Sequence, residues 1–465
     1  MSRLVSHSGD PGVSELDLVI RNGTVVTAQT RGLGDVLIRS GRIVDVVADG
    51  WDGTARSSID ATGLLVFPGM IDTHVHLMEP GDPTRETFAE GTAAAARAGV
   101  TTIIEHTHGW PVHELGRLAE KRDHLTDRAH VDYGLAAHVW TDRLDQLEPL
   151  WHAGIAFFKI FTCTTHGVPG IGADRLLDVF GRLAELDARC LVHCEDELIT
   201  AATERLLRAA DRVDPELLTE WRSREAELVA VSQVTAAASL TNAVVRVAHA
   251  SHPAVVSLIS HAREHGVTIS AETCPQYLLL REQELATEGA LRKFTPPARI
   301  RSDVDQAAMW DLLSTGDLDT VSSDHAPSTR QQKLAGDIWS APFGLPGLDT
   351  TFPLLLDAIS SGFITPERVA DVYARRPASH FGLAHKGQLA PGFDADMVLV
   401  DPERTWDVRD DDLLSHAGWS PFSGRRLRGS AVLTLLRGQV VCADGMISEQ
   451  RHGRFRPGLG AAERL

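Results

Sequence analysis

The chain has 465 residues, of which 43% are hydrophobic and 23% charged, and its formal net charge is -18. This length allows one large domain with a smaller one, or two to three domains. The acidic balance argues against nucleic acid or an anionic membrane as the main partner, although an anionic substrate stays open. The five cysteines form no CxxC pair, and no signal-peptide core or uncharged run of transmembrane length is present. We therefore expect reduced cysteines and a cytoplasmic protein.

Residues 16–67 are typical of short strands joined by tight turns. LDLVIRNGTVVT places an Asn-Gly pair between two β-branched runs, and DVLIRSGRIVDVV does the same with Ser-Gly. Both pairs predict β-hairpins.

From about residue 68 to 385, short apolar runs alternate with Ala-, Leu- and Arg-rich helical stretches. The expected strands are MIDTHVH, TTIIEH, VDYGLAAHV, AFFKIF, CLVHC, VRVAHAS, TISAET and TVSSDH. This alternation predicts a closed (β/α)8 barrel of the TIM type rather than an open sheet. Residues 203–237 predict a longer helical excursion. Residues 325–347 predict a Gly- and Pro-containing loop that covers the mouth of the barrel.

After about residue 386 the strands return without helices. GQLAPGFDADMVLVD and AVLTLLRGQVVCADGM are again hairpin-like. We predict a central catalytic barrel at 68–385, flanked by a β-sandwich domain whose two parts are residues 1–67 and 386–465.

Polar residues stand at the C-terminal ends of the predicted strands, where barrel active sites lie. His74 and His76 form an HxH pair, whose two imidazoles point to the same side of a strand and can reach one metal ion. A single histidine at a strand end is more often a hydrogen-bonded core residue. Four histidines, one lysine and one aspartate at predicted strand ends together favour a metal site. They are His74, His76, Lys159, His193, His249 and Asp324.

Lys159 stands in the apolar run AFFKIFTC. A buried ammonium is costly unless it is paired or chemically changed. The simpler interpretation is a lysine whose head group reaches water from the strand end.

The combination of strand-end residues resembles the amidohydrolase superfamily, and within it the cyclic-amidase branch of hydantoinases, dihydropyrimidinases, allantoinases and dihydroorotases. The resemblance starts at FPGMIDTHVHL and continues through FFKIF, LVHCE, AETCPQY, TPPAR and SSDHAP. It extends to GQLAPGFDADMVLVD and SPFSGRRLRGSAVLTLLRGQVV near the C-terminus. It implies a hydrolase that acts on carbon–nitrogen bonds other than peptide bonds, in small cyclic amides.

The resemblance also implies how the six residues act. Lys159 would react with CO2 to form a carbamate (N6-carboxylysine) that bridges two divalent metal ions. One ion would be held by His74, His76 and Asp324, and the other by His193 and His249. Zinc is the expected metal, and manganese, cobalt and iron stay open. A hydroxide bridging both ions would attack the ring carbonyl, and Asp324 would carry its proton to the leaving ring nitrogen. Relatives commonly form homotetramers or homodimers, so we expect a homo-oligomer.

The ring that is opened is less well specified. Dihydroorotases resemble each other in an arginine two residues after the HxH pair and in a later asparagine. Met78 and the EHTHGWP stretch stand at those places here, and Arg85 is an open substitute. Dihydropyrimidinases and D-hydantoinases share a tyrosine five residues after the lysine, where this chain has Thr164. We therefore expect an allantoinase- or hydantoinase-like enzyme. Dihydropyrimidinase- or dihydroorotase-like activity, or hydrolysis of an imide or other amide, are the alternatives.

Further positions are matched to substrate contacts by the same resemblance. We expect Thr164, Thr273 and Gly347 to bind substrate. His106, His108 and Trp110 in EHTHGW are candidates for reshaping the pocket; the alternative is that His106 and His108 are polar loop residues. An alternative of another class is a non-catalytic assembly protein of the same fold, which should show gaps in the metal-ligand set; all six positions are filled here.

Overall fold

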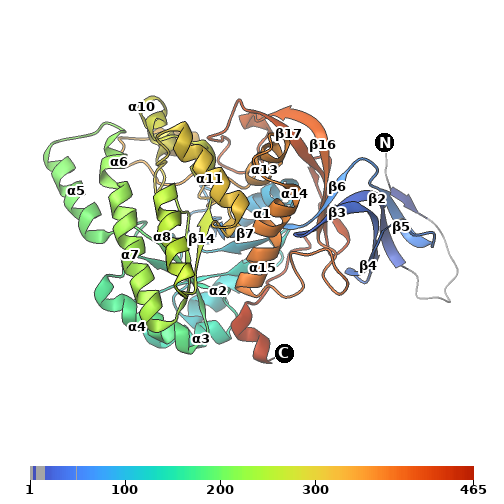
Figure 1. Cartoon of the computed structure of the whole chain (residues 1–465), viewed down its shortest axis with the longest axis horizontal. Coiled ribbons are helices and arrows are strands. Elements are labelled where there is room, and N and C mark those ends of the chain that lie inside the picture. The colour runs from blue at the N-terminus through green and yellow to red at the C-terminus, as the bar shows by residue number, and fades with distance from the viewer. Residues whose placement is uncertain (1–3, 7–15, 49, 465) are drawn as a thin grey trace.

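The middle of the chain forms a barrel of parallel strands surrounded by helices, in a computed structural model that describes residues 4–6, 16–48 and 50–464 (Figure 1). The barrel strands lie where the sequence predicts them. They are β7 (Met70–Val75), β8 (Val100–Glu105), β9 (Asp132–Leu135) with β10 (Ala137–His138), β11 (Phe158–Phe161), β12 (Arg189–His193), β13 (Val244–Val247), β14 (Ile269–Thr273) and β15 (Thr320–Val321).

The strands are paired in chain order, in a six-stranded part from β10 to β15 and a three-stranded part from β7 to β9. The two parts meet at Ala136, whose N–H donates to the Glu105 carbonyl at 3.1 Å while Ala137 N–H donates to Phe157. The ring closes where Val75 pairs in parallel with His325. Because every strand runs in the same direction, all C-terminal ends meet at one mouth.

Helices follow the strands and cover the outside of the barrel (Figure 1). Local capping sets where they begin: at α1 the Thr87 hydroxyl accepts from Glu90 N–H, and the Glu90 carboxylate accepts from Thr87 N–H. The helices are α1 (Phe88–Arg97), α2 (Leu115–Leu125), α3 (Leu147–His152), α4 (Ala173–Glu185), α5 (Glu197–Ala209), α6 (Leu217–Trp221), α7 (Arg224–Thr241), α8 (Pro253–Glu264), α9 (Pro275–Leu279), α10 (Leu285–Glu288), α11 (Asp303–Thr315), α12 (Arg330–Leu334), α13 (Thr351–Ser360), α14 (Pro366–Ala370) and α15 (Arg376–Phe381). Segments α5 to α7 form the predicted helical excursion, and α12 lies within the predicted covering loop.

Strands from both ends of the chain share one ten-stranded sheet beside the barrel, as the sequence predicts (Figure 1). β6 pairs antiparallel with β16, which joins the two halves. The sheet encloses its own apolar cluster, to which Ile20, Val36 and Leu399 belong. Its strands are β1 (Leu4–Ser6), β2 (Leu16–Val26), β3 (Arg31–Arg39), β4 (Arg42–Ala48), β5 (Ala55–Asp60), β6 (Leu65–Pro68), β16 (Met397–Asp407), β17 (Arg426–Leu436), β18 (Gln439–Ala443) and β19 (Met446–Ile447).

The predicted hairpin at Asn22-Gly23 is wrong, because β2 runs straight through this pair. Asn22 takes a left-handed backbone with φ 60°, and the pairing register with β3 shifts between Ile20 and Gly23. A Cβ on Gly23 would lie 2.5 Å from the Val66 side chain. The pair therefore makes a β-bulge in the pairing of β2 with β3 instead of a turn, and Gly23 packs against Val66 of β6.

The other turn signals have mixed outcomes. Ser40-Gly41 forms the predicted hairpin between β3 and β4, and Arg437-Gly438 forms the one between β17 and β18. GQLAPGFDADMVLVD forms only the start of β16, because residues 387–396 run as a loop. Residues 1–3 and 7–15, where no signal segment is predicted, lie outside the described residues.

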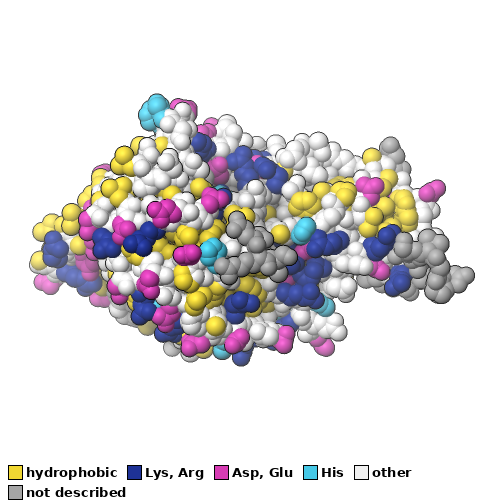
Figure 2. Space-filling model, turned by 90° about the horizontal axis from the view of Figure 1, so that it is seen from below, with side chains coloured by type: hydrophobic (Ala, Val, Ile, Leu, Met, Phe, Trp, Pro, Cys, Tyr) yellow, Lys and Arg dark blue, Asp and Glu magenta, His cyan; other side chains and the backbone are white. Residues whose placement is uncertain are grey.

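The molecular surface carries mixed charge. On the face shown in Figure 2, basic and acidic side chains are interspersed over the barrel rather than gathered into a stripe of one sign. Among the described residues, no helix combines the length and the apolar character that crossing a membrane would require.

Candidate active site

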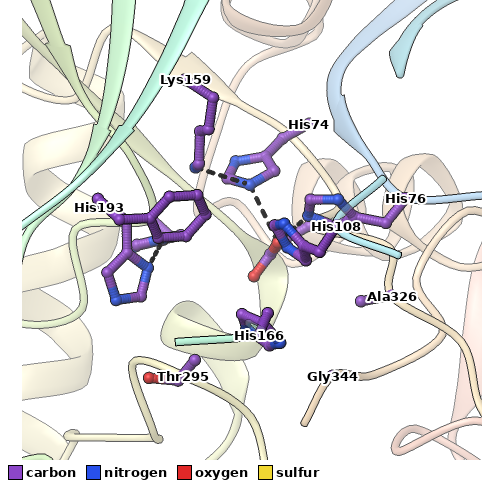
Figure 3. Close-up of a pocket in the computed structure, with 12 residues that line it drawn as sticks. His74, His76, His108, Lys159, His166, His193, Thr295, Ala326 and Gly344 are labelled. Atoms are coloured by element: carbon purple, nitrogen blue, oxygen red, sulfur yellow. Dashed lines mark hydrogen bonds and ion pairs between the residues drawn. The ribbon is translucent and has the colours of Figure 1, made fainter. Parts of the chain in front are cut away.

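Six side chains from five strand ends converge at the mouth of the barrel and line one pocket (Figure 3). Each belongs to the set that the sequence singles out. His74, Lys159 and His193 lie in β7, β11 and β12. His76 directly follows β7, and His249 and Asp324 lie within three residues of the ends of β13 and β15. We call these six residues the strand-end cluster. All are buried apart from the Asp324 side chain, which is 14% exposed.

Within this cluster the side chains form two groups. Asp324 Oδ1 lies 3.1 Å from His74 Nε2 and 3.5 Å from His76 Nε2. His193 Nδ1 lies 3.0 Å from His249 Nε2. Lys159 Nζ lies 3.3 Å from His74 Nε2, next to the first group.

The outward nitrogens of three rings are already engaged, which turns the other nitrogen of each ring into the pocket. His74 Nδ1 meets Glu272 at 2.7 Å, and His76 Nδ1 meets the His106 carbonyl at 2.9 Å. His193 Nε2 meets Glu195 at 2.9 Å. Partners of this kind fix the orientation of metal-binding histidines. The donor set of imidazoles and carboxylate therefore fits divalent transition metals such as zinc.

Glu195 is the centre of a charged network behind His193. Its carboxylate accepts from Arg222 at 3.0 Å, Arg299 at 2.7 Å and the Thr295 hydroxyl at 2.7 Å. Burial alone would raise the pKa of Glu195, but Arg222 and the other donors hold it well below its usual range. The carboxylate is therefore charged and holds the His193 ring in place.

Burial also governs the protonation of the cluster itself. It lowers the pKa of Lys159 to about 8, although Asp324 and Glu272 oppose the shift. It raises the pKa of Asp324 to about 7, against the effect of Lys159. Burial lowers the pKa of the histidines, so the rings are neutral, the form that binds metals. An amine with a lowered pKa is more often neutral and nucleophilic.

Two residues of the cluster adopt a backbone conformation that is unusual for their type. His249 has φ 40° and Asp324 has φ 49°. Residues other than glycine occupy this left-handed region rarely and at a cost in conformational energy. The surrounding structure therefore holds both side chains at the pocket.

The chain was compared with known proteins. The family model described as amidohydrolase family matches residues 65–441. An allantoinase from Rubrobacter xylanophilus is 36% identical over 460 residues, covering 97% of this chain and 100% of the relative. A dihydroorotase from Halobacterium salinarum is also 36% identical, over 88% of this chain and 96% of the relative. The L-hydantoinase (dihydropyrimidinase) structure from Arthrobacter aurescens superposes with a TM-score of 0.90 at 29% identity, covering 95% and 100% of the two chains.

The chain belongs to the amidohydrolase family. It is a cyclic amidohydrolase, an enzyme that acts on carbon–nitrogen bonds other than peptide bonds. This sets aside the alternative of a non-catalytic assembly protein. Members of the family generally use two metal ions and a carboxylated lysine, and residue groups able to hold metal are present in this amidohydrolase.

Those groups differ in what they already bind. His74, His76 and His106 offer ligand atoms within 4.8 Å of one another. Cys163, His193 and Glu195 form a second group, but Arg222 already donates to two of its members. The aspartates of the third group, Asp132, Asp394 and Asp396, surround the ammonium of Lys386.

The three residues expected to bind substrate do not line the pocket of this amidohydrolase. The Thr273 hydroxyl donates to the Ala250 carbonyl at 3.0 Å, and Gly347 N–H donates to His325 Nδ1 at 3.0 Å. Thr164 is exposed, and its hydroxyl accepts from Gly170 N–H at 3.2 Å. Their contact with substrate stays a prediction.

The remaining pocket-lining residues come from the loops after the strands. They are His108, Phe161, His166, Thr295, Ala326 and Gly344. The sequence marks His108 through the unusual EHTHGW stretch, and Thr295 stands in the quoted TPPAR motif. His166 was missed, although loops after barrel strands are where such residues are expected. Arg85 does not line the pocket; its Nε donates to the Pro327 carbonyl at 2.8 Å.

Proposed function

We propose that the protein opens a cyclic ureide or amide of the allantoin or hydantoin type by hydrolysis. The observation that carries this proposal is the convergence of the strand-end cluster on one pocket. In this proposal Lys159 is carboxylated, His74, His76 and Asp324 hold one metal ion, His193 and His249 hold the other, and the carbamate is shared. Zinc ions bound there would supply an activated water and a polarised carbonyl.

The chain's own groups would position and move protons. Asp324 accepts the proton of the attacking water and passes it to the ring nitrogen as the carbon–nitrogen bond breaks. Its position supports this role, because it lines the pocket and its side chain, 14% exposed, is the most accessible of the cluster. Glu272 and Glu195 keep the His74 and His193 rings oriented while this happens.

Sequence identity does not select the ring, because the allantoinase and the dihydroorotase are both 36% identical to this chain. The pocket favours allantoin or hydantoin. The side chains that line it beyond the strand-end cluster include no arginine or lysine for the carboxylate of dihydroorotate. Met78, at the place of the dihydroorotase arginine, is a buried apolar residue.

The test is ring opening by the zinc-loaded, bicarbonate-treated protein. The substrates are allantoin, hydantoin, a 5-substituted hydantoin, dihydrouracil, dihydroorotate and phthalimide. We expect turnover of allantoin or a hydantoin. Turnover of dihydroorotate alone would contradict the choice of ring, and turnover of none with both metals bound would contradict the substrate class.

The role of Asp324 is tested by Asp324→Asn. We expect turnover to fall about 1,000-fold or more, because the amide cannot carry the proton. The dissociation constant for substrate, measured by calorimetry, should change far less. Metal content is measured alongside, since Asp324 is also an expected ligand. Unchanged turnover would remove Asp324 as the proton carrier.

The oligomeric state also stays a proposal. We infer a homo-oligomer, with a tetramer or a dimer as the candidates, and analytical ultracentrifugation measures it directly.

A further inference from the structure

Four histidines outside the strand-end cluster gather on one side of the pocket. His106 and His108 follow β8, His138 ends β10, and His166 lies in the loop after β11. We call these four residues the histidine wall. His108 and His166 line the pocket itself, and Figure 3 shows His108 beside His76 with His166 near Thr295 and Gly344.

The wall is continuous with the strand-end cluster. The His108 ring centroid lies 4.1 Å from that of His76 and 4.4 Å from that of His166, to which it is nearly parallel at 12°. His106 stands 4.4 Å from His76, and His138 stands 5.6 Å from His108. A group bound against the wall would therefore sit next to the reacting part of the substrate.

Several nitrogens of the wall have no partner. Both ring nitrogens of His106 and of His138, and Nδ1 of His108, are buried without a hydrogen bond among the described residues. Buried polar atoms are almost always hydrogen-bonded in folded proteins. So many unpaired atoms in one place indicate a ligand that bonds to some of them.

The surroundings favour a neutral ligand. Beyond the strand-end cluster the pocket is lined by imidazole, phenyl, hydroxyl and backbone groups, with no carboxylate, arginine or lysine. Glu105, which precedes His106 in the chain, is paired with Lys121. The charged groups of the pocket, Lys159 and Asp324, belong to the strand-end cluster and are assigned to the metal ions, so the wall offers a ligand no fixed charge of its own.

We propose that the histidine wall is a subsite for a neutral, hydrogen-bonding substituent on the substrate ring, of the ureido or carboxamide type. A neutral imidazole offers one N–H donor and one acceptor nitrogen. A ureido group offers N–H donors and a carbonyl acceptor, so the two are complementary. The inference rests on the proposed function and narrows its substrate class.

The test compares allantoin with hydantoin, which has the same ring without the ureido group. The variants are His108→Leu and His166→Leu, with His108→Gln as the variant that keeps a donor and an acceptor. His261→Leu, at an exposed position on α8, is the control. We expect the ratio of kcat/KM for allantoin to kcat/KM for hydantoin to fall about 10- to 100-fold in His108→Leu, in addition to any loss that both substrates share. His108→Gln should recover part of the loss.

Equal losses for both substrates would overturn the proposal, because they would indicate a purely structural role. No loss for either would overturn it as well. Metal analysis adds a third readout: a third zinc ion in the wild type that is lost in His108→Leu would make the wall a cation site instead.

Failure of the proposed function gives a different result. If the wild-type holoenzyme opens neither ring, calorimetry measures the binding of both compounds. Tighter binding of allantoin that His108→Leu removes would still support the subsite. Equal binding of the two compounds, or binding of neither, would overturn it.

Discussion

The Lys159 ammonium group lies beside an imidazole nitrogen rather than beside a carboxylate. Its Nζ lies near His74 Nε2, and among the described residues no carboxylate lies within ion-pair distance of it. Burial in an apolar strand lowers its pKa to about 8, although the field of Asp324 opposes this. A lysine in such a place is poorly suited to remain an ammonium and well suited to react as a neutral amine.

If Lys159 carries the proposed carbamate, replacing it with alanine should prevent binding of the two metals and lower turnover by about 1,000-fold or more, because the anion proposed to hold both would be lost. Metal analysis and ring-opening rates measure both effects. Lys159→Arg is the matched variant: it keeps a cation but cannot form the carbamate, so it should fail in the same way. A short carboxylic acid added to Lys159→Ala should restore part of the activity. Full activity with both metals in Lys159→Ala would contradict the assignment.

Two buried lysines bind backbone carbonyls of the loop after β15, residues 325–347. Lys333 Nζ donates to the carbonyls of Lys293 at 2.7 Å, Pro342 at 2.9 Å and Gly344 at 3.1 Å. Lys293 Nζ donates to Trp339 at 3.0 Å and to Ala341 at 2.5 Å. Since Gly344 lines the pocket, these contacts place part of the pocket wall.

These lysines predict a pH effect with a definite sign. Burial lowers the pKa of Lys293 from 10.5 to about 8. Between about pH 8 and 10.5 the unfolded chain therefore binds more protons than the folded one, and this group makes stability rise with pH. We expect Lys293→Met to flatten that rise. The measurement is the urea midpoint of both proteins at pH 7.5 and 10, and an unchanged slope in the variant would contradict the prediction.

At the scale of elements, the sequence predicts the barrel well because its chemistry is periodic. The same pattern, a short apolar run that ends in a polar residue, recurs along the barrel segment. This recurrence identifies His74, Lys159 and Asp324 as members of one site. The hairpin predicted at Asn22-Gly23 is a bulge because the same dipeptide suits a turn and a bulge. The close packing of Gly23 on Val66, a residue distant in sequence, is not visible in the local pattern. His166 and Gly344 reach the pocket through loop conformations that no local pattern encodes. The domain boundaries at 67/68 and 385/386 stay predictions.

Over the whole molecule, all five lysines are buried. Lys121, Lys159, Lys293, Lys333 and Lys386 each expose 3% or less of their surface, so arginine alone supplies the exposed basic side chains. Lysine is among the residues least often buried in proteins. Each of these five has a specific environment: Lys159 lines the active-site pocket, and the other four are packed within the protein.

This burial predicts resistance to amine-reactive reagents. Acylation of the native protein at pH 8, followed by peptide mapping, should leave these lysines largely unmodified, whereas acylation in denaturant should modify all of them. Exposed amines react because they are accessible as well as partly neutral, and access is what the fold removes. Rapid labelling of Lys121 or Lys386 in the native protein would contradict the burial described here.

Lys386 joins the barrel to the flanking sheet. Its Nζ lies 2.6 Å from Asp132 in β9, 2.5 Å from Asp396 before β16 and 3.1 Å from Asp394. Arg437, in the turn between β17 and β18, donates to the same Asp132 carboxylate at 2.5 Å. Charges from the barrel and from the sheet are therefore neutralised in one buried place. Removing a single partner of such a group leaves uncompensated charge in a medium that solvates it poorly.

Lys386→Met should lower the free energy of unfolding by about 3–5 kcal/mol, because three aspartates would lose their central cation. Urea unfolding followed by circular dichroism and by tryptophan fluorescence measures the loss. A double variant, Lys386→Met with Asp396→Asn, should regain part of the stability, since it removes one of the uncompensated charges. If the ionic cluster couples the barrel to the flanking sheet, Lys386→Met should also separate the unfolding transition of the barrel from that of the sheet. An unchanged midpoint would mean that the apolar contacts between barrel and sheet suffice without the ionic cluster.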